Sequence, residues 1–205
     1  NFLHGDVFNQ NLISEAFGYN VDAIEGLFFP DTYFYKSDTR SSEILLLALK
    51  KMESILKREW KEKSEEINDV IKTPYDALIL ASIVEKEAVL DVEKPIIAGV
   101  FIKRLLKNMK LQSDPTVIYA MGDTYKGNIK RADLKINSPF NTYRQKGLPP
   151  TPIGAPGLGA LRAVLNPLLS DYLYFVSKND GSHKFSRTLK EHNEAVNYYQ
   201  RKKRK

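Results

Sequence analysis

The sequence contains no cysteine among its 205 residues. This absence excludes disulfide bonds and metal sites with cysteine ligands, and it is compatible with a protein that works outside the cytoplasm. Histidine is also scarce. The three that occur, His4, His183 and His192, do not form an HExxH motif or another metal-ligand spacing. We therefore expect neither a metal ion nor another cofactor.

Long apolar runs are missing as well. No segment approaches the roughly 20 apolar residues of a membrane-spanning helix, and no signal peptide is visible. The chain begins at Asn1 without an initiator methionine, so we interpret it as a fragment or a processed form. The absence of an anchor in this sequence therefore says little about the full protein.

The composition is that of a folded protein with a basic surface. Hydrophobic residues make up 42% of the chain and charged residues 27%, which suits one sizeable core and argues against wholesale disorder. The formal net charge of +6 fits an anionic partner such as nucleic acid, membrane headgroups or an acidic cell-wall polymer. No nucleic-acid-binding motif is present, so no nucleic-acid partner is expected. We interpret the basic tail 201–205 as a solvated helix end.

Periodicity and turn signals predict a chain of helices with one β-hairpin. Apolar residues recur at helical spacing in several segments, and Thr-Pro and Thr-x-x-Glu pairs mark helix starts. The expected helices lie at 42–61, from Thr73 through Glu85, from about Pro95, at 158–165 and after Thr188, with the hairpin around Asn179-Asp180-Gly181. This mixture indicates the α+β class, with a mainly helical, lysozyme-like core and a small β-hairpin region.

Glu85 is the candidate catalytic residue. It lies at the end of a strongly apolar helical stretch and shares a helix face with Ser82. Burial in apolar surroundings would raise its pKa, and a carboxylic acid that is protonated near neutral pH can donate a proton to the leaving oxygen of a glycosidic bond. The alternative is that Glu85 pairs with Lys86 or Arg104 and only closes the helix end. Glu87, about 200° around the helix, is interpreted as an exposed or supporting group.

Residues 110–157 are rich in turn formers, which is typical of a functional loop region. Their polar side chains include groups suited to binding sugar hydroxyl and N-acetyl groups, namely Gln112, Ser113, Asp114, Asn141 and Tyr143. Each of them could instead cap a loop or form a turn. His183, beside the hairpin, either binds substrate or is a buried histidine with satisfied hydrogen bonds.

Several ordered blocks give the chain a more specific resemblance. They are Glu25–Tyr33 (EGLFFPDTY), Ala81–Glu87 (ASIVEKE), Leu111–Tyr119 (LQSDPTVIY), Asn141–Tyr143 (NTY), Gly147–Pro150 (GLPP), Ala155–Gly157 (APG), Asn166–Pro167, Tyr172–Val176 (YLYFV), His183–Phe185 (HKF) and His192–Asn193. In this order and spacing they resemble the YceG/MltG family of endolytic lytic transglycosylases. The resemblance covers most of the chain.

The resemblance implies an activity and a set of site residues. The first glutamate of the SIVEKE block, Glu85, corresponds to the family's proposed catalytic acid. The implied reaction is non-hydrolytic cleavage of the β-1,4 bond between N-acetylmuramic acid and N-acetylglucosamine inside a glycan strand, which leaves a 1,6-anhydromuramoyl end. The enzyme would be a lyase that needs no metal or cofactor. The residues expected to bind substrate are Ser82, Gln112, Asp114, Asn141 and Tyr143.

The resemblance also implies a location and partners. Family members are anchored in the bacterial cytoplasmic membrane by one N-terminal helix, which is absent from this chain, and they work on its outer face. The expected partners are peptidoglycan strands and the glycan-polymerising penicillin-binding synthases. We expect residues 1–24 to be a lead-in from a truncated LysM-like region or linker, 25–200 the catalytic domain and 201–205 a basic tail.

Two other functions remain open. The first is a peptidoglycan hydrolase in which Glu85 is the acid and Asp114 or Glu87 the second carboxylate. The second is a non-catalytic module that binds glycan or nucleic acid through its basic surface. The mass of the product distinguishes the enzymes, since an anhydro product is one water lighter than a hydrolysed one.

Overall fold

The structure, a computed structural model of the chain, describes residues 23–201. Helices make up most of its regular structure, and the described residues form one sheet, a two-stranded antiparallel hairpin. The α+β class is therefore confirmed. The main elements are α2 (Ser41–Lys61), α3 (Pro74–Glu87), α4 (Lys94–Leu106), α5 (Asp114–Met121), α6 (Leu158–Leu165), β1 (Tyr174–Ser177), β2 (His183–Ser186) and α7 (Leu189–Val196). Residues 1–22 and 202–205, which make up most of the expected lead-in 1–24 and basic tail 201–205, lie outside the described residues.

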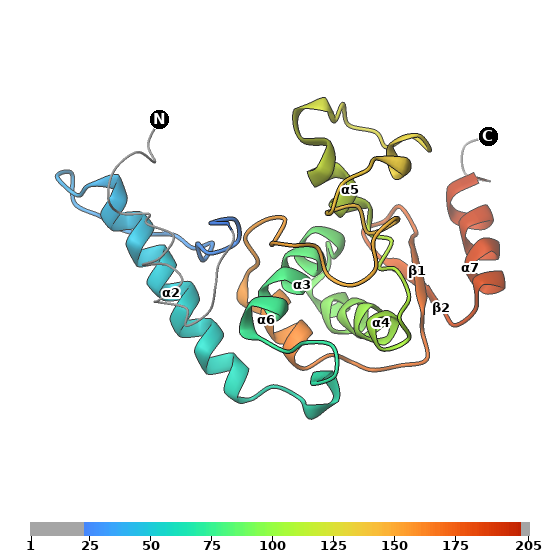
Figure 1. Cartoon of the computed structure of the whole chain (residues 1–205), viewed down its shortest axis with the longest axis horizontal. Helices are drawn as coiled ribbons and strands as arrows, with labels where there is room; N and C mark the ends of the chain where they lie inside the picture. The colour runs from blue at the N-terminus through green and yellow to red at the C-terminus, as the bar shows by residue number, and fades with distance from the viewer. Residues whose placement is uncertain (1–22, 202–205) are drawn as a thin grey trace.

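Helix α3 lies in the middle of the molecule, with α4 and α6 packed against it and α2 alongside (Figure 1). Thr73 caps its start: the Thr73 hydroxyl accepts the backbone N–H of Asp76, and the Asp76 carboxylate accepts the backbone N–H of Thr73. Nine of the fourteen residues of α3 are buried, as the apolar sequence predicts for a central helix. Helix α3 is thus buried over most of its length, and its last residues, 85–87, reach the surface.

Helix α4 approaches the following chain segment unusually closely at Gly99. A Cβ atom at this position would lie 2.2 Å from the carbonyl oxygen of Leu168, so any side chain would clash with backbone. The segment is held there by a hydrogen bond from the Leu168 N–H to the Pro95 carbonyl, 3.0 Å long. Glycine therefore sets the spacing between α4 and the connection that leads to the hairpin.

The hairpin and α7 form a unit at one end of the molecule (Figure 1). The strands pair with Tyr174 opposite Ser186 and Ser177 opposite His183, and the turn contains positive φ angles at Asn179 and Gly181. Helix α7 packs against both strands. The hairpin and the final helix predicted from the sequence are both confirmed.

One α-helix is additional to the sequence prediction. Residues 110–157 contain α5, an eight-residue helix with Pro115 in its first turn. The rest of that stretch consists of turns and short 3-10 helices. No helix within residues 23–201 combines the length and the apolar character that crossing a membrane requires.

Candidate functional site

A cavity of about 440 Å³ lies between the helical core and the C-terminal unit. Its size is in the range of pockets that bind small molecules or single sugars. The core side of the lining comes from the end of α3, from α4 and from the start of α5, and the other side comes from β1, β2 and α7. The lining residues are Glu87, Arg104, Leu111, Gln112, Asp114, Tyr143, Tyr174, Phe175, Val176, Ser177, His183, Leu189, His192, Asn193, Val196 and Gln200.

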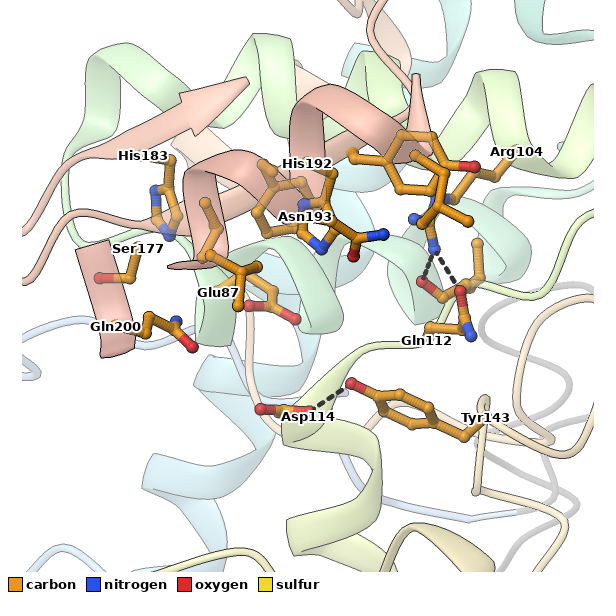
Figure 2. Close-up of a pocket in the computed structure, with 16 residues that line it drawn as sticks. Glu87, Arg104, Gln112, Asp114, Tyr143, Ser177, His183, His192, Asn193 and Gln200 are labelled. Atoms are coloured by element: carbon orange, nitrogen blue, oxygen red, sulfur yellow. Dashed lines mark hydrogen bonds between the residues drawn. The ribbon is translucent and has the colours of Figure 1, made fainter. Parts of the chain in front are cut away.

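Glu87 is the carboxylate that α3 places in this cavity (Figure 2). It is the last residue of the helix and is only partly exposed. The Ser113 hydroxyl donates a hydrogen bond to Glu87 Oε1, 2.5 Å long. Burial raises the pKa of Glu87 to about 7, with a further contribution from the negative charge of Asp114, although Ser113 and Arg104 act in the opposite direction. Glu87 therefore carries a proton for a large part of the time near neutral pH.

Asp114 and Tyr143 form a pair on the same cavity wall (Figure 2). The Tyr143 hydroxyl donates to Asp114 Oδ1 at 2.6 Å. Burial, followed by the charge of Asp114, raises the pKa of Tyr143, so the phenol stays protonated. Gln112 also lines the cavity and accepts a hydrogen bond from Arg104 at 3.3 Å. Three of the residues predicted to bind substrate, Gln112, Asp114 and Tyr143, are thus brought together beside Glu87.

Arg104 is a buried cation that joins the two sides of the cavity. Its Nε donates to the Leu173 carbonyl at 2.7 Å, and its Nη1 donates to the carbonyls of Lys110 and Leu111 at 3.1 and 2.7 Å. Its guanidinium also lies 5.1 Å from the centre of the Tyr174 ring. Arg104 thereby fixes β1 against the segment that leads into α5.

Glu85 lies elsewhere. Its carboxylate accepts hydrogen bonds from Lys94 Nζ at 3.1 and 3.2 Å and from the backbone N–H of Gly157, the N-cap residue of α6, at 3.2 Å. Its surroundings are therefore polar, whereas the sequence predicted apolar ones. Its partner is Lys94 rather than Lys86 or Arg104. Burial favours neutral Lys94, but the hydrogen bonds to Asp91 and Glu85 outweigh it and raise the pKa of Lys94. Glu85 thus joins α3 to the starts of α4 and α6.

Ser82 and Asn141 also lie outside the cavity lining. The Ser82 hydroxyl is buried and accepts the backbone N–H of Ile153 at 2.9 Å. Asn141 is fully buried, and its amide donates to the carbonyls of Leu134 and Ile136 at 3.1 and 2.8 Å. Each side chain holds a loop in place, which is the structural alternative considered for Asn141.

Two histidines line the cavity from the C-terminal unit. His183 Nδ1 lies 2.7 Å from Glu93 Oε2, and the His183 N–H donates to Glu93 Oε1 at 3.0 Å. The ring of His192 stacks on Tyr174, and its buried Nδ1 has no hydrogen-bond partner among the described residues. Burial, followed by the charge of Arg104, lowers the pKa of His192, so this ring stays neutral near pH 7. Both residues belong to the lining of the cavity that contains Glu87.

Sequence reasoning gave Glu87 a site role only as a candidate second carboxylate of the alternative hydrolase, and it did not select Arg104 or His192. Arg104 carries a detectable signal, because it falls on the apolar stripe of its helix, one turn after Val100 and Phe101. Nothing in the periodicity of α3 shows which of its faces borders a cavity, since the helix is apolar on nearly every side. In the part of the chain that the structure describes, no cluster of three or more His, Asp or Glu side chains is arranged to bind a metal.

Comparison with known proteins identifies the family of the chain. The model of the YceG-like family matches residues 5–198. The chain belongs to the YceG-like family. It is similar to the endolytic murein transglycosylase of Bacillus subtilis (strain 168), with 40% identity over 195 residues. It is also similar to the endolytic murein transglycosylase of Streptococcus pneumoniae (strain ATCC BAA-255 / R6), with 36% identity over 162 residues.

The matched region is a larger share of this YceG-like chain than of its relatives. It spans 95% of the chain but 51% of the Bacillus protein, and 75% of the chain but 28% of the Streptococcus protein. The crystal structure of a YceG-like protein from Listeria monocytogenes has the same fold, with a TM-score of 0.78 and 35% identity, and the match covers 90% of this chain and 62% of that one. The chain spans about half the length, or less, of the curated relatives that it matches.

Proposed function

We propose that this chain is the catalytic part of an endolytic lytic transglycosylase that cleaves peptidoglycan glycan strands. The observation that carries the proposal is the carboxyl group of Glu87, which lines a cavity and has a pKa of about 7. Two similar proteins are named endolytic murein transglycosylases. A protonated carboxyl group in a pocket of sugar-binding size supplies what cleavage of a glycosidic bond requires.

In the proposed mechanism, Glu87 acts first as acid and then as base. Its proton passes to the oxygen between N-acetylmuramic acid C1 and N-acetylglucosamine C4 as the C1–O bond breaks. The resulting carboxylate then takes the proton of the muramic C6 hydroxyl while that oxygen bonds to C1. The products are a free C4 hydroxyl and a 1,6-anhydro ring, and Glu87 is protonated again. One carboxylate suffices, because the substrate supplies the nucleophile.

Assigning the acid to Glu87 differs from the prediction of Glu85. The carboxylate of Glu85 is held by the ammonium group of Lys94 and the start of α6, whereas that of Glu87 faces the cavity lined by Gln112, Asp114 and Tyr143. An acid catalyst must reach the bond that it protonates, so position favours Glu87. Asp114 and Tyr143 would hold the sugar through their remaining hydrogen-bonding positions.

Two glutamine variants test the assignment. We expect Glu87→Gln to reduce turnover by more than about 100-fold with the fold retained, because glutamine cannot transfer the proton. Glu85→Gln removes one charge of an ion pair, so it should lower the melting temperature but leave the turnover of folded protein within a few-fold of wild type. Digestion of purified glycan strands, followed by mass spectrometry, measures both. The opposite result, an inactive Glu85→Gln and an active Glu87→Gln, would support the assignment made from the sequence.

A hydrolase is the second candidate, because Asp114 provides another carboxylate in the same cavity. In that case Asp114 would activate water, and the products would be one water heavier than the anhydro products. We favour the transglycosylase, since Asp114 Oδ1 already accepts the Tyr143 hydroxyl. Action on the outer face of the cytoplasmic membrane, an anchor outside this chain and a synthase partner are parts of the same proposal.

A further inference from the structure

A second cavity adjoins the first. It has a volume of about 780 Å³ and lies between residues 129–131, the hairpin turn and the C-terminal end of the chain's last helix. We call it the arginine cavity, and its lining residues are Ile129, Arg131, Asn179, Val196, Tyr199, Gln200 and Arg201. Two guanidinium groups contribute to this lining, and no acidic side chain does.

The two cavities lie next to each other. Val196 and Gln200 line both of them, and Gln200 is visible at the edge of the cavity that contains Glu87 (Figure 2). The boundary is held by the Asn179 amide, which donates to the Tyr199 carbonyl at 2.9 Å and so ties the hairpin turn to the π-helical turn Asn197–Arg201. A group attached to a molecule in the first cavity is therefore within reach of the second.

The positive charges of the arginine cavity are not neutralised locally. Within residues 23–201, no carboxylate forms an ion pair with Arg131 or Arg201. Among residues 23–201, Arg201 donates one hydrogen bond, from Nη1 to Asn197 Oδ1 at 2.9 Å, so most of its N–H groups have no partner in this part of the chain. A guanidinium group stays charged at all relevant pH values and binds planar carboxylates through two parallel hydrogen bonds. Two such groups beside one cavity favour an anionic ligand.

We propose that the arginine cavity binds the carboxylates of a peptide stem carried by the glycan strand whose sugars occupy the cavity at Glu87. This inference rests on the proposed function, because peptidoglycan is the polymer whose muramic acid residues carry such peptides. The peptide is attached covalently to the same strand, so its concentration at an adjoining cavity is high whenever the sugars are bound. Arg131 and Arg201 thereby distinguish strands with stems from strands without them.

Binding without turnover tests the inference. In the Glu87→Gln background, affinities are measured for soluble glycan strands with intact stems and for the same strands after an amidase has removed the peptides. We expect stem-bearing strands to bind several-fold to about tenfold more tightly, and we expect Arg131→Gln combined with Arg201→Gln to abolish that preference. Each single variant should reduce it partly. Loss of the preference with added salt is also expected.

The matched control is Lys50→Gln combined with Lys61→Gln. It removes the same two positive charges from exposed positions on α2, which lies at the opposite end of the molecule from α7 (Figure 1). The inference is overturned if this control removes the preference equally, if both kinds of strand bind alike, or if a glycerol phosphate polymer competes as well as free stem peptide. Mass spectrometry of wild-type digests tests the transglycosylase activity separately. The proposed activity and the proposed binding of the peptide stem can therefore be contradicted independently of each other.

Discussion

At the scale of single residues, the surroundings of Glu87 determine the pH at which its carboxyl group loses its proton. Removal from water is the main cause of its raised pKa, and the nearby charge of Asp114 adds to the effect. The hydrogen bond from Ser113 and the positive charge of Arg104 limit the shift, so the pKa settles at about 7 rather than higher. A group with this pKa can both donate and accept a proton at neutral pH, which the two steps of the proposed mechanism require.

Asp114→Asn should therefore change the pH dependence of cleavage. The substitution removes a negative charge that raises the pKa of Glu87, so that pKa should fall. Because the protonated form is the active acid, the alkaline limb of the kcat/KM profile should move to lower pH, by roughly half a unit to one unit. The asparagine oxygen can still accept the hydroxyl of Tyr143, which preserves the local geometry.

The control for this experiment is Asp123→Asn, which makes the same charge change at an exposed residue in the short 3-10 helix Gly122–Thr124. Its profile should match that of wild type. An alkaline limb that stays in place or moves to higher pH in Asp114→Asn would contradict the role given to this carboxylate.

The residues of the site differ in how far the sequence predicted them. Gln112, Asp114 and Tyr143 line the cavity, and all three come from the loop blocks selected for their polar chemistry. The choice between Glu85 and Glu87 depends on which side of a buried helix borders a cavity, and the cavity is made by a C-terminal unit about 90 residues further along the chain. Local periodicity contains no information about that contact.

At the scale of secondary-structure elements, Gly99 has a packing role that cannot be inferred from the sequence. Glycine in a helix interior usually costs about 1 kcal/mol relative to alanine, so alanine would be expected to stabilise α4. The carbonyl of Leu168 occupies the space of the missing side chain, however. The helix therefore requires glycine for packing despite its poor helix propensity.

We expect Gly99→Ala to lower the free energy of unfolding by about 2 kcal/mol or more, because backbone must move to admit the methyl group. Gly159→Ala in α6 is the matched control. Its added Cβ would lie 3.7 Å from the nearest atoms, an ordinary contact, so it should be neutral or slightly stabilising. Urea denaturation of both variants measures the difference, and equal stabilities would show that α4 can shift freely.

The elements with strong local signals were predicted well. Thr73, Pro74 and the apolar stretch after them predicted α3, and helix α6 has the predicted bounds Leu158–Leu165. Helix α5 was not predicted, because Asp114-Pro115 fits a turn as well as a helix start. The loop anchored by Asn141 depends on hydrogen bonds to distant backbone carbonyls, and no short sequence pattern specifies those.

At the scale of the whole molecule, the cavity exists only because two parts of the chain meet. The helical core supplies Glu87, Asp114 and Tyr143, and the C-terminal unit supplies the opposite wall with His183 and His192 (Figure 2). Arg104 binds carbonyls on both sides. A small displacement of the C-terminal unit would therefore change both the access to Glu87 and the burial that sets its pKa.

The same burial links the stability of the fold to pH. An unfolded chain releases the Glu87 proton near pH 4.5, whereas the folded protein keeps it until about pH 7. The folded state thus binds more protons between these values, so the free energy of unfolding should fall as the pH rises from 4.5 to 7, by at most about 3 kcal/mol from this group. Glu87→Gln lacks this contribution. Melting curves across this range should therefore show the melting temperature of Glu87→Gln rising relative to that of wild type as the pH rises. A constant difference between the two melting temperatures would mean that Glu87 ionises normally in the folded protein.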